Sequence, residues 1–111
     1  MVVYFFVIIH LYWGNYLFKR GYLFDYEPYI NINGKAYFPD FMVGNFIIEA
    51  TEWKHPSILK LSNLKNKIKN YKKAGFRIVF FIPKNFRKFY KEISDSCISA
   101  LPEIDHFLMP L

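Results

Sequence analysis

The chain has 111 residues, of which 53% are hydrophobic and 22% aromatic, so it can form one core and is not a disordered segment. Fifteen Lys and Arg against nine Asp and Glu give a net charge of +6, which favours a polyanionic partner such as nucleic acid. A single cysteine, Cys97, excludes an internal disulfide and suits a reducing compartment, so we expect a cytoplasmic protein. No repeat or linker divides the chain, which predicts one domain over residues 1–111.

The first segment, residues 2–18, carries no formal charge and is therefore compared with a membrane span. It is shorter than the roughly twenty apolar residues that a span needs, and His10 is one of several polar or small residues that interrupt it. A secretory signal would begin with a basic stretch, and none precedes the segment. We expect no membrane partner, and bulky apolar residues over 9–20, followed by Gly21, predict a buried first helix.

Two turn dipeptides divide the next segment into strands. Asn33-Gly34 is typical of a type I′ turn, because both central residues of that turn need positive φ, and it predicts strands over residues 26–32 and 35–43. Gly44-Asn45 predicts a second turn, and the strand-forming run 46–48 follows it. The segment therefore predicts a three-stranded meander.

The remaining elements alternate between helix and strand. Apolar residues recur at spacings of three and four over 57–73, which predicts an amphipathic helix that stops at Gly75. The apolar run 77–82 predicts an inner strand buried on both faces. A basic helix near 85–94 and a last strand near 104–109 are expected to follow. This order predicts an α/β protein with a mixed sheet covered by helices.

Two acidic residues become neighbours in this arrangement. Counting back from the Gly44-Asn45 turn pairs Asp40 with Glu49 across adjacent strands. Opposed carboxylates about 5 Å apart between their Cβ atoms repel each other, and a divalent cation between them would remove the repulsion. The other interpretation is that both acids point to solvent or pair with nearby lysines. Apolar residues on both faces of the strands favour Mg²⁺, which can activate water and stabilise charge on a scissile phosphate.

Three short segments resemble the PD-(D/E)XK, or restriction-endonuclease-like, nuclease superfamily. They are Tyr26-Glu27-Pro28, Phe38-Pro39-Asp40-Phe41 and Phe46-Ile47-Ile48-Glu49-Ala50. The resemblance covers residues 8–92 and implies a restriction-endonuclease-like core in the order helix-strand-strand-strand-helix-strand with flanking helices. It also implies that Asp40, Glu49 and the carbonyl of Ala50 bind Mg²⁺ or Mn²⁺, and that the activity is phosphodiester hydrolysis.

The chain departs from the superfamily pattern at the position of the motif lysine, which holds Thr51. Glu52-Trp53-Lys54 contains a Glu-X-Lys string, but strand alternation puts Glu52 on the face away from Asp40 unless a bulge intervenes. We therefore do not take this string as the motif.

A lysine from the following helix is the expected replacement, since the chain after Glu49 resembles superfamily members that use one. On a helical wheel Lys60 lies nearer the centre of the apolar stripe than Lys65 or Lys67, and it lies in the first turns. We rank Lys60 first and Lys54 second as the catalytic lysine. The other interpretation for each is an ordinary solvated charge.

Superfamily members often carry another acid on the first helix, and residues 2–20 contain none. Glu27 is the candidate for this additional acid, and its other interpretation is an exposed charge on an edge strand. The histidines His10, His55 and His106 have no spacing typical of zinc, so we assign no metal to them.

Positive charge gathers in the second half of the chain and is interleaved with aromatic residues. The candidates for phosphate contacts are Lys65, Lys67, Lys72, Arg87 and Lys88. Nothing in the chain resembles a base-reading module, so we expect structure-directed or weakly sequence-specific cleavage, with DNA ahead of RNA as substrate. Many nucleases of this superfamily pair up to cut two strands, and the resemblance therefore implies a homodimer.

Three classes of function remain open at this level. The first is a Mg²⁺-dependent endonuclease or exonuclease. The second is a catalytically inactive protein with the nuclease fold that only binds nucleic acid, which Thr51 and the missing helix acid favour. The third is a structural or inhibitory protein that only contacts other proteins, and the aromatic content alone supports it.

Overall fold

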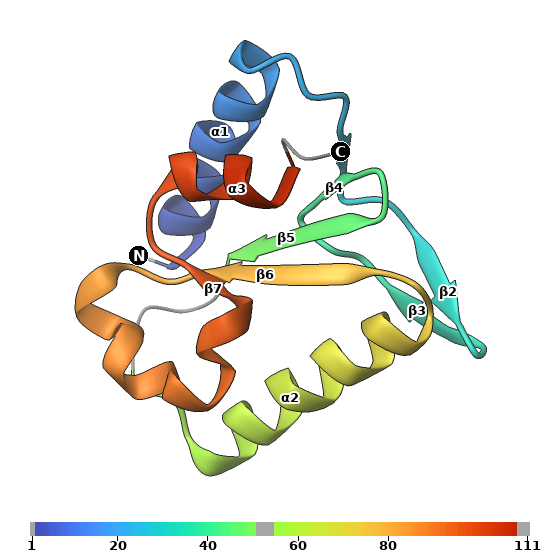
Figure 1. Ribbon diagram of the computed structural model, residues 1–111, viewed down its shortest axis with the longest axis vertical. Coiled ribbons are helices and arrows are strands. Elements are labelled where there is room, and N and C mark those ends of the chain that lie inside the picture. Colours follow the sequence, from blue (N-terminus) through green and yellow to red (C-terminus); the bar gives the residue numbers. More distant parts are fainter. Residues whose placement is uncertain (1, 51–54, 109–111) are drawn as a thin grey trace.

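The computed structural model describes residues 2–50 and 55–108, which form a mixed sheet between two helical layers (Figure 1). In chain order the elements are α1 (Val2–Lys19), β1 (Asp25–Tyr26), β2 (Ile30–Ile32), β3 (Lys35–Tyr37), β4 (Phe41–Val43), β5 (Phe46–Ala50), α2 (Ile58–Lys73), β6 (Arg77–Phe81), the 3₁₀ segment η1 (Lys84–Ser96), β7 (Cys97–Ile98), the 3₁₀ turn η2 (Leu101–Glu103) and α3 (Ile104–Leu108).

The main sheet has five strands in the order β1-β4-β5-β6-β7, and β2 pairs only with β3 in a separate two-stranded sheet. β4 runs antiparallel to β1 and to β5, whereas β5, β6 and β7 are parallel. Parallel neighbours need a crossover connection, and α2 provides it between β5 and β6. The prediction of an α/β protein with a mixed sheet and covering helices is confirmed.

Both predicted turn dipeptides close tight turns. The β2-β3 ladder closes at Asn33-Gly34, whose φ values of 52° and 85° are those that a type I′ turn requires. The β4-β5 ladder closes at Gly44-Asn45, where Val43 pairs with Phe46 and Gly44 has a φ of 61°. The pairing of β4 with β5 is therefore the one counted from the sequence.

The two long strands expected on either side of Asn33-Gly34 are each interrupted, so the simple meander was wrong. After β1 the chain turns out of the sheet at Glu27, which has a positive φ of 49°, and Pro28 follows. Pro39 separates β3 from β4. Because proline has no backbone N–H to donate to a ladder, both sites break the strand pairing. The β2-β3 hairpin consequently projects from the main sheet (Figure 1).

The segment 84–96 is not the α-helix that was expected near 85–94. It forms 3₁₀ turns with non-helical backbone at Tyr90 and Ile93. Both of these side chains are buried, at 1% and 5% exposed, among the residues that α2 covers. Their burial overrides the weak preference of the segment for a regular helix.

The last strand is β7, and the strand expected near 104–109 was wrong. Residues 104–108 form the short helix α3. Ile104 and Leu108 are 0% and 4% exposed, and their spacing of four residues puts them on one face of a helix. Residues four apart also share one face of a strand, so this spacing alone could not distinguish a helix from a strand in the sequence.

Two apolar cores lie on opposite faces of the sheet. Trp13 of α1 packs in the core that contains Ile48, and Leu64 of α2 packs in the core that contains Ile47. Side chains alternate along a strand, so Glu49 shares the α2 face with Ile47. Within residues 2–50 and 55–108 no helix is both long enough and apolar enough to cross a membrane.

Candidate active site at the end of strand β5

Asp40 and Glu49 meet where β4 begins and β5 ends. The ladder pairs Phe41 with Ile48, and continuing this register by one residue puts Asp40 opposite Glu49. Asp40 Oδ2 accepts a hydrogen bond of 2.8 Å from the amide of Ala50, and Glu49 is only 8% exposed. The two acids therefore do not point freely into solvent, although Glu49 does pair with a lysine.

That lysine is Lys67 of α2, whose Nζ lies 3.0 Å from Glu49 Oε2. The helical wheel had ranked Lys60 ahead of Lys67, whereas it is Lys67 that forms the ion pair with Glu49. Helix α2 starts beyond the end of β5 and runs back beneath the sheet, which brings a residue of its middle turns level with Glu49 (Figure 1). Lys60 stays near enough for its charge to lower the pKa of Glu49. Lys54 lies outside the described residues.

His10 of α1 is the site residue that sequence reasoning missed. Its Nε2 lies 3.4 Å from Asp40 Oδ1, and its Nδ1 forms a hydrogen bond of 2.8 Å with the hydroxyl of Tyr26. The Nε2 atom is buried and has no hydrogen-bond partner among the described residues. One signal could have found it, because His10 is a polar residue in a largely apolar first helix.

Glu27 reaches the rim of the same site. Its Oε1 lies 3.9 Å from His10 Nδ1, and its backbone amide donates a hydrogen bond of 2.9 Å to the carbonyl of Asp40. The side chain is 52% exposed, and its charge raises the pKa of Asp40. Glu27 therefore lies beside the carboxylate pair, where an additional acid of the site was expected, but on the side of the pair that faces solvent.

Burial raises the pKa of both paired carboxyl groups. For Asp40 the loss of solvent is the largest cause, opposed by the Ala50 amide and by the electrostatic effect of His10. For Glu49 the loss of solvent is again the largest cause, opposed by Lys67, while the neighbouring Asp40 charge adds to the rise. The two groups therefore resist being ionised together.

This resistance makes a prediction for stability. A carboxyl group whose pKa is raised by folding binds more protons in the folded than in the unfolded chain, so its contribution to stability is present at low pH and is lost as pH rises. We expect wild-type protein in EDTA to lose unfolding free energy, relative to the double variant Asp40→Asn with Glu49→Gln, as the pH rises above about 4, the ordinary pKa of the two carboxyl groups. Thermal denaturation of both proteins as a function of pH is the measurement.

The comparison is controlled internally, because every other titrating group is common to both proteins. Asp105, for example, has a lowered pKa because Tyr22, Tyr16 and Arg20 bind its carboxylate, and its loss of stability at low pH cancels in the difference. A difference in melting temperature that does not change with pH would show that the carboxylate pair is not under electrostatic strain.

The residues that could hold a divalent cation are few. Among residues 2–50 and 55–108 no three His, Cys, Asp or Glu side chains are close enough together to hold a metal ion by themselves. Mg²⁺ commonly takes only one or two carboxylates and keeps several waters, so Asp40 and Glu49 with the carbonyl of Ala50 remain a fitting donor set. Their opposed, partly dehydrated carboxylates are the structural feature that a cation would relieve.

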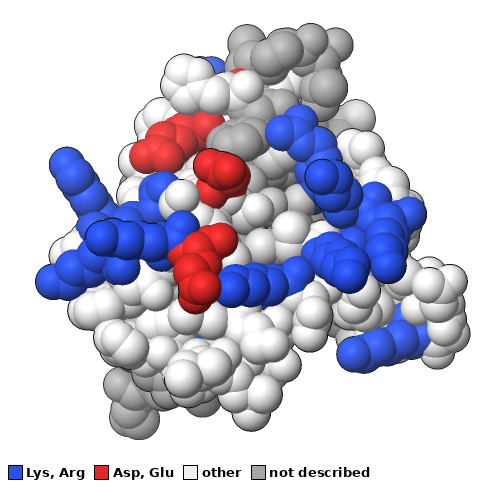
Figure 2. Space-filling view, turned by 60° about the horizontal axis from the view of Figure 1, so that its bottom comes forward, with Lys and Arg blue, Asp and Glu red and all other residues white. Residues whose placement is uncertain are grey.

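Basic side chains gather on the face of the molecule where α2 and η1 lie. Figure 2 shows Lys and Arg gathered on both sides of a smaller acidic group, on the face where α2 and η1 lie. Several candidates for phosphate contacts already have partners within the chain: Lys65 pairs with Glu92 at 2.8 Å, Arg87 donates to Ser99 Oγ at 2.9 Å, and Lys88 lies over the ring of Phe89 at 5.2 Å. The Lys65–Glu92 pair is exposed and can exchange for a phosphate contact, because surface ion pairs are weak.

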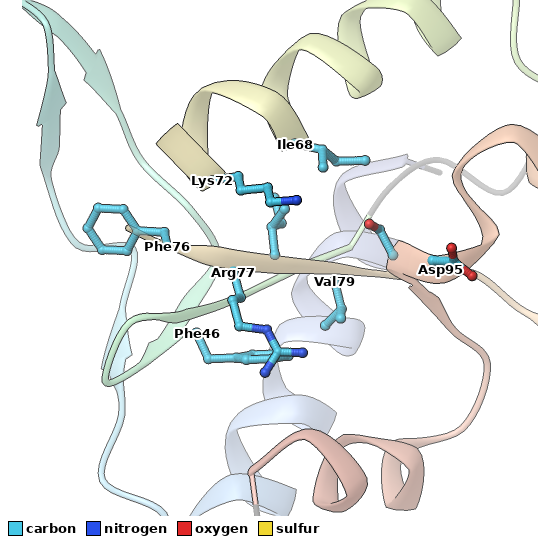
Figure 3. A pocket seen from close by; sticks show the side chains of 9 residues that line it. Phe46, Ile68, Lys72, Phe76, Arg77, Val79 and Asp95 are labelled. Carbon is cyan, nitrogen blue, oxygen red and sulfur yellow. The ribbon is translucent and has the colours of Figure 1, made fainter. Parts of the chain in front are cut away.

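Lys72 borders a separate hollow of about 340 Å³ at the other end of β5 and β6. Figure 3 shows Lys72 on the α2 side of β6 and Arg77 on the opposite side, where its guanidinium lies 5.3 Å from the centre of the Phe46 ring. Asp95 of η1 closes the hollow. Because Glu49 lies at the far end of β5, Lys72 is not part of the carboxylate site.

A scan against protein-family models gives no match, and searches of curated proteins and of solved structures find no similar protein. The chemistry of the site is therefore inferred from its own geometry. It combines two opposed carboxylates, an ammonium group and an imidazole where β4 begins and β5 ends.

Proposed function

We propose that the protein is a metal-dependent nuclease that hydrolyses phosphodiester bonds in DNA, with structure-directed or weak sequence specificity. One observation carries the proposal: Asp40 and Glu49 are opposed at a strand end, and the Nζ of Lys67 lies 3.0 Å from Glu49. Carboxylates that hold a cation beside a lysine are the groups that hydrolysis of a phosphate diester needs.

The order of elements supports the same proposal. With the β2-β3 hairpin regarded as an insertion, α1, β1, β4, β5, α2 and β6 follow one another as in the restriction-endonuclease-like core implied by the resemblance. In addition, β5 and β6 are parallel neighbours across α2. Glu49 lies on β5, and Asp40 directly precedes β4, its antiparallel neighbour.

The residues would divide the chemistry as follows. Asp40, Glu49 and the carbonyl of Ala50 would hold Mg²⁺ or Mn²⁺, which supplies Lewis acidity and a more acidic bound water when present. Lys67 orients the attacking water or steadies the charge that develops on the phosphate. His10, whose Nε2 lies 3.4 Å from Asp40 Oδ1, would hold the Asp40 carboxylate in place from α1, and the Tyr26 hydroxyl orients the imidazole ring.

The test is a cleavage assay with purified protein and labelled duplex, single-stranded, branched and RNA substrates. We expect cleavage in Mg²⁺ or Mn²⁺, no cleavage in EDTA, and faster cleavage of DNA than of RNA. Sedimentation in the same buffers tests whether the active form is the homodimer that cutting of two strands would use. If no substrate is cut in either metal, the proposal fails.

A catalytically inactive nucleic-acid-binding protein is the second candidate, and one observation favours it. The carboxylates already have internal partners, since Asp40 accepts the Ala50 amide and Glu49 pairs with Lys67. This alternative predicts an affinity for nucleic acid that falls steeply with salt and is the same with and without EDTA. Affinity that rises when Mg²⁺ is added would count against it.

A further inference from the structure

A groove of about 420 Å³ opens beside the carboxylates, between α1 and the edge strand β1. Its walls are His10, Leu11, Gly14, Asn15 and Phe18 of α1 and, from the sheet side, Phe24, Tyr26 and Phe41. Three aromatic rings form the sheet wall, and the Phe41 ring contacts the other two, with ring centres 5.8 Å apart for Phe24 and Phe41 and 5.3 Å apart for Tyr26 and Phe41.

The groove differs in charge from its surroundings. No Lys, Arg, Asp or Glu is among the described residues that line it, although the chain carries a net charge of +6. Leu11 and Phe18 on its rim are 63% and 78% exposed, so water covers apolar surface there. A flat, uncharged and aromatic group is the kind of occupant that would gain most from these walls.

The groove is also continuous with the carboxylate site. His10 lines the groove and lies 3.4 Å from Asp40 Oδ1, and Tyr26 lines the groove and binds His10 at 2.8 Å. One side chain, His10, therefore separates an occupant of the groove from the Asp40 carboxylate. A nucleotide has the matching arrangement, because its uncharged aromatic base lies beside its charged phosphate.

We infer that the groove receives one nucleobase of a single-stranded nucleic acid, adjacent to the phosphate that is cut. This inference rests on the proposed function and narrows its substrate class. A base paired within a duplex faces its partner, and only an unpaired or extruded base can enter a side groove. Aromatic walls stack on bases without selecting a sequence, which agrees with the weak specificity expected above.

Two variants test the groove without touching the carboxylates. Gly14→Leu fills it from the α1 wall; a Cβ at this position would lie 3.8 Å from the nearest Phe41 atom, which is ordinary contact. Phe18→Ala removes an exposed aromatic side chain from the rim. The matched control is Phe38→Ala, which removes an aromatic side chain that is 64% exposed and does not line the groove.

The readout is the fluorescence of single-stranded DNA that carries one 2-aminopurine base, moved along the strand, with binding measured in EDTA so that no cleavage occurs. We expect quenching at one position, and a roughly 10- to 100-fold loss of affinity in the two groove variants but not in Phe38→Ala. Duplex DNA should show no such loss. Thermal denaturation verifies that each variant is folded.

The outcomes separate this inference from the nuclease proposal. Absence of quenching at every position, or equal affinity in all variants, would overturn the inference even if wild-type protein cuts DNA. Quenching that the groove variants abolish, in a protein that cuts nothing, would support the groove while the nuclease proposal fails. A change in sedimentation without any change in DNA binding would assign the groove to a second copy of the chain and overturn the inference.

Discussion

Replacement of Asp40 by Asn is expected to reduce cleavage by about 10³-fold, because it removes one of the two charges that hold the cation, and several kcal/mol of transition-state stabilisation depend on that cation. Asparagine keeps an oxygen that can accept the Ala50 amide, so the end of β5 should remain in place. The measurement is kcat/KM in Mg²⁺, with the melting temperature determined in parallel.

The matched control is Asp25→Asn, which neutralises an exposed acid on β1, the neighbouring strand of the same sheet. This variant should cut at the wild-type rate. If Asp40→Asn also cuts at the wild-type rate, the opposed carboxylates are not the catalytic centre. Loss of activity together with a large fall in melting temperature would instead indicate a structural defect, and Glu49→Gln then serves as the second variant.

The position of the carboxylate pair could be read from the sequence because it depends on local rules. The Gly44-Asn45 turn has two residues, and a two-residue turn fixes which residues face each other across the hairpin. Counting from it gave Asp40 opposite Glu49, and the observed pairing of Val43 with Phe46 has the same register. No information about distant parts of the chain was needed.

The partners of the pair could not be read in the same way. His10 and Lys67 reach the site from two helices, one on each face of the sheet. A helical wheel gives the direction in which Lys60 or Lys67 points, but not how far along its axis the helix is displaced relative to the strand. That displacement depends on packing in the core and on the path of the chain between β5 and α2, which periodicity does not encode.

The interrupted strands show a second limit. Alternation and turn residues predicted two continuous strands around Asn33-Gly34, whereas Pro28 and Pro39 end the pairing on both sides of the hairpin. Proline cannot donate a hydrogen bond to a strand ladder, so the two prolines predict these breaks even though the hydrophobic pattern continues through them. These breaks directly adjoin Glu27 and Asp40. The strand ends that the hydrophobic pattern did not predict are therefore next to two residues of the candidate site.

Lys67→Ala is expected to lower turnover by about 10²- to 10³-fold and to change DNA affinity little, since a lysine that steadies developing charge acts mainly in the transition state. Lys60→Ala should have a smaller effect, because Lys67 and not Lys60 forms the 3.0 Å ion pair with Glu49. The control is Lys69→Ala, which removes an exposed charge from the same helix. Single-turnover rates and equilibrium binding are the two measurements.

The pH dependence distinguishes catalysis by Lys67 from simple neutralisation of Glu49. Lys67 lowers the pKa of Glu49 against the effect of burial, so its removal raises that pKa. Glu49 must be ionised to hold a cation, and the acidic limb of the rate profile should therefore move to higher pH in Lys67→Ala. Lys67→Arg keeps the positive charge and should restore the acidic limb, but not the full rate, if the amine itself positions water.

Full recovery of the rate in Lys67→Arg would reduce Lys67 to a positioning residue. A wild-type rate in Lys67→Ala with an inactive Lys60→Ala or Lys54→Ala would instead assign the catalytic lysine to one of those residues.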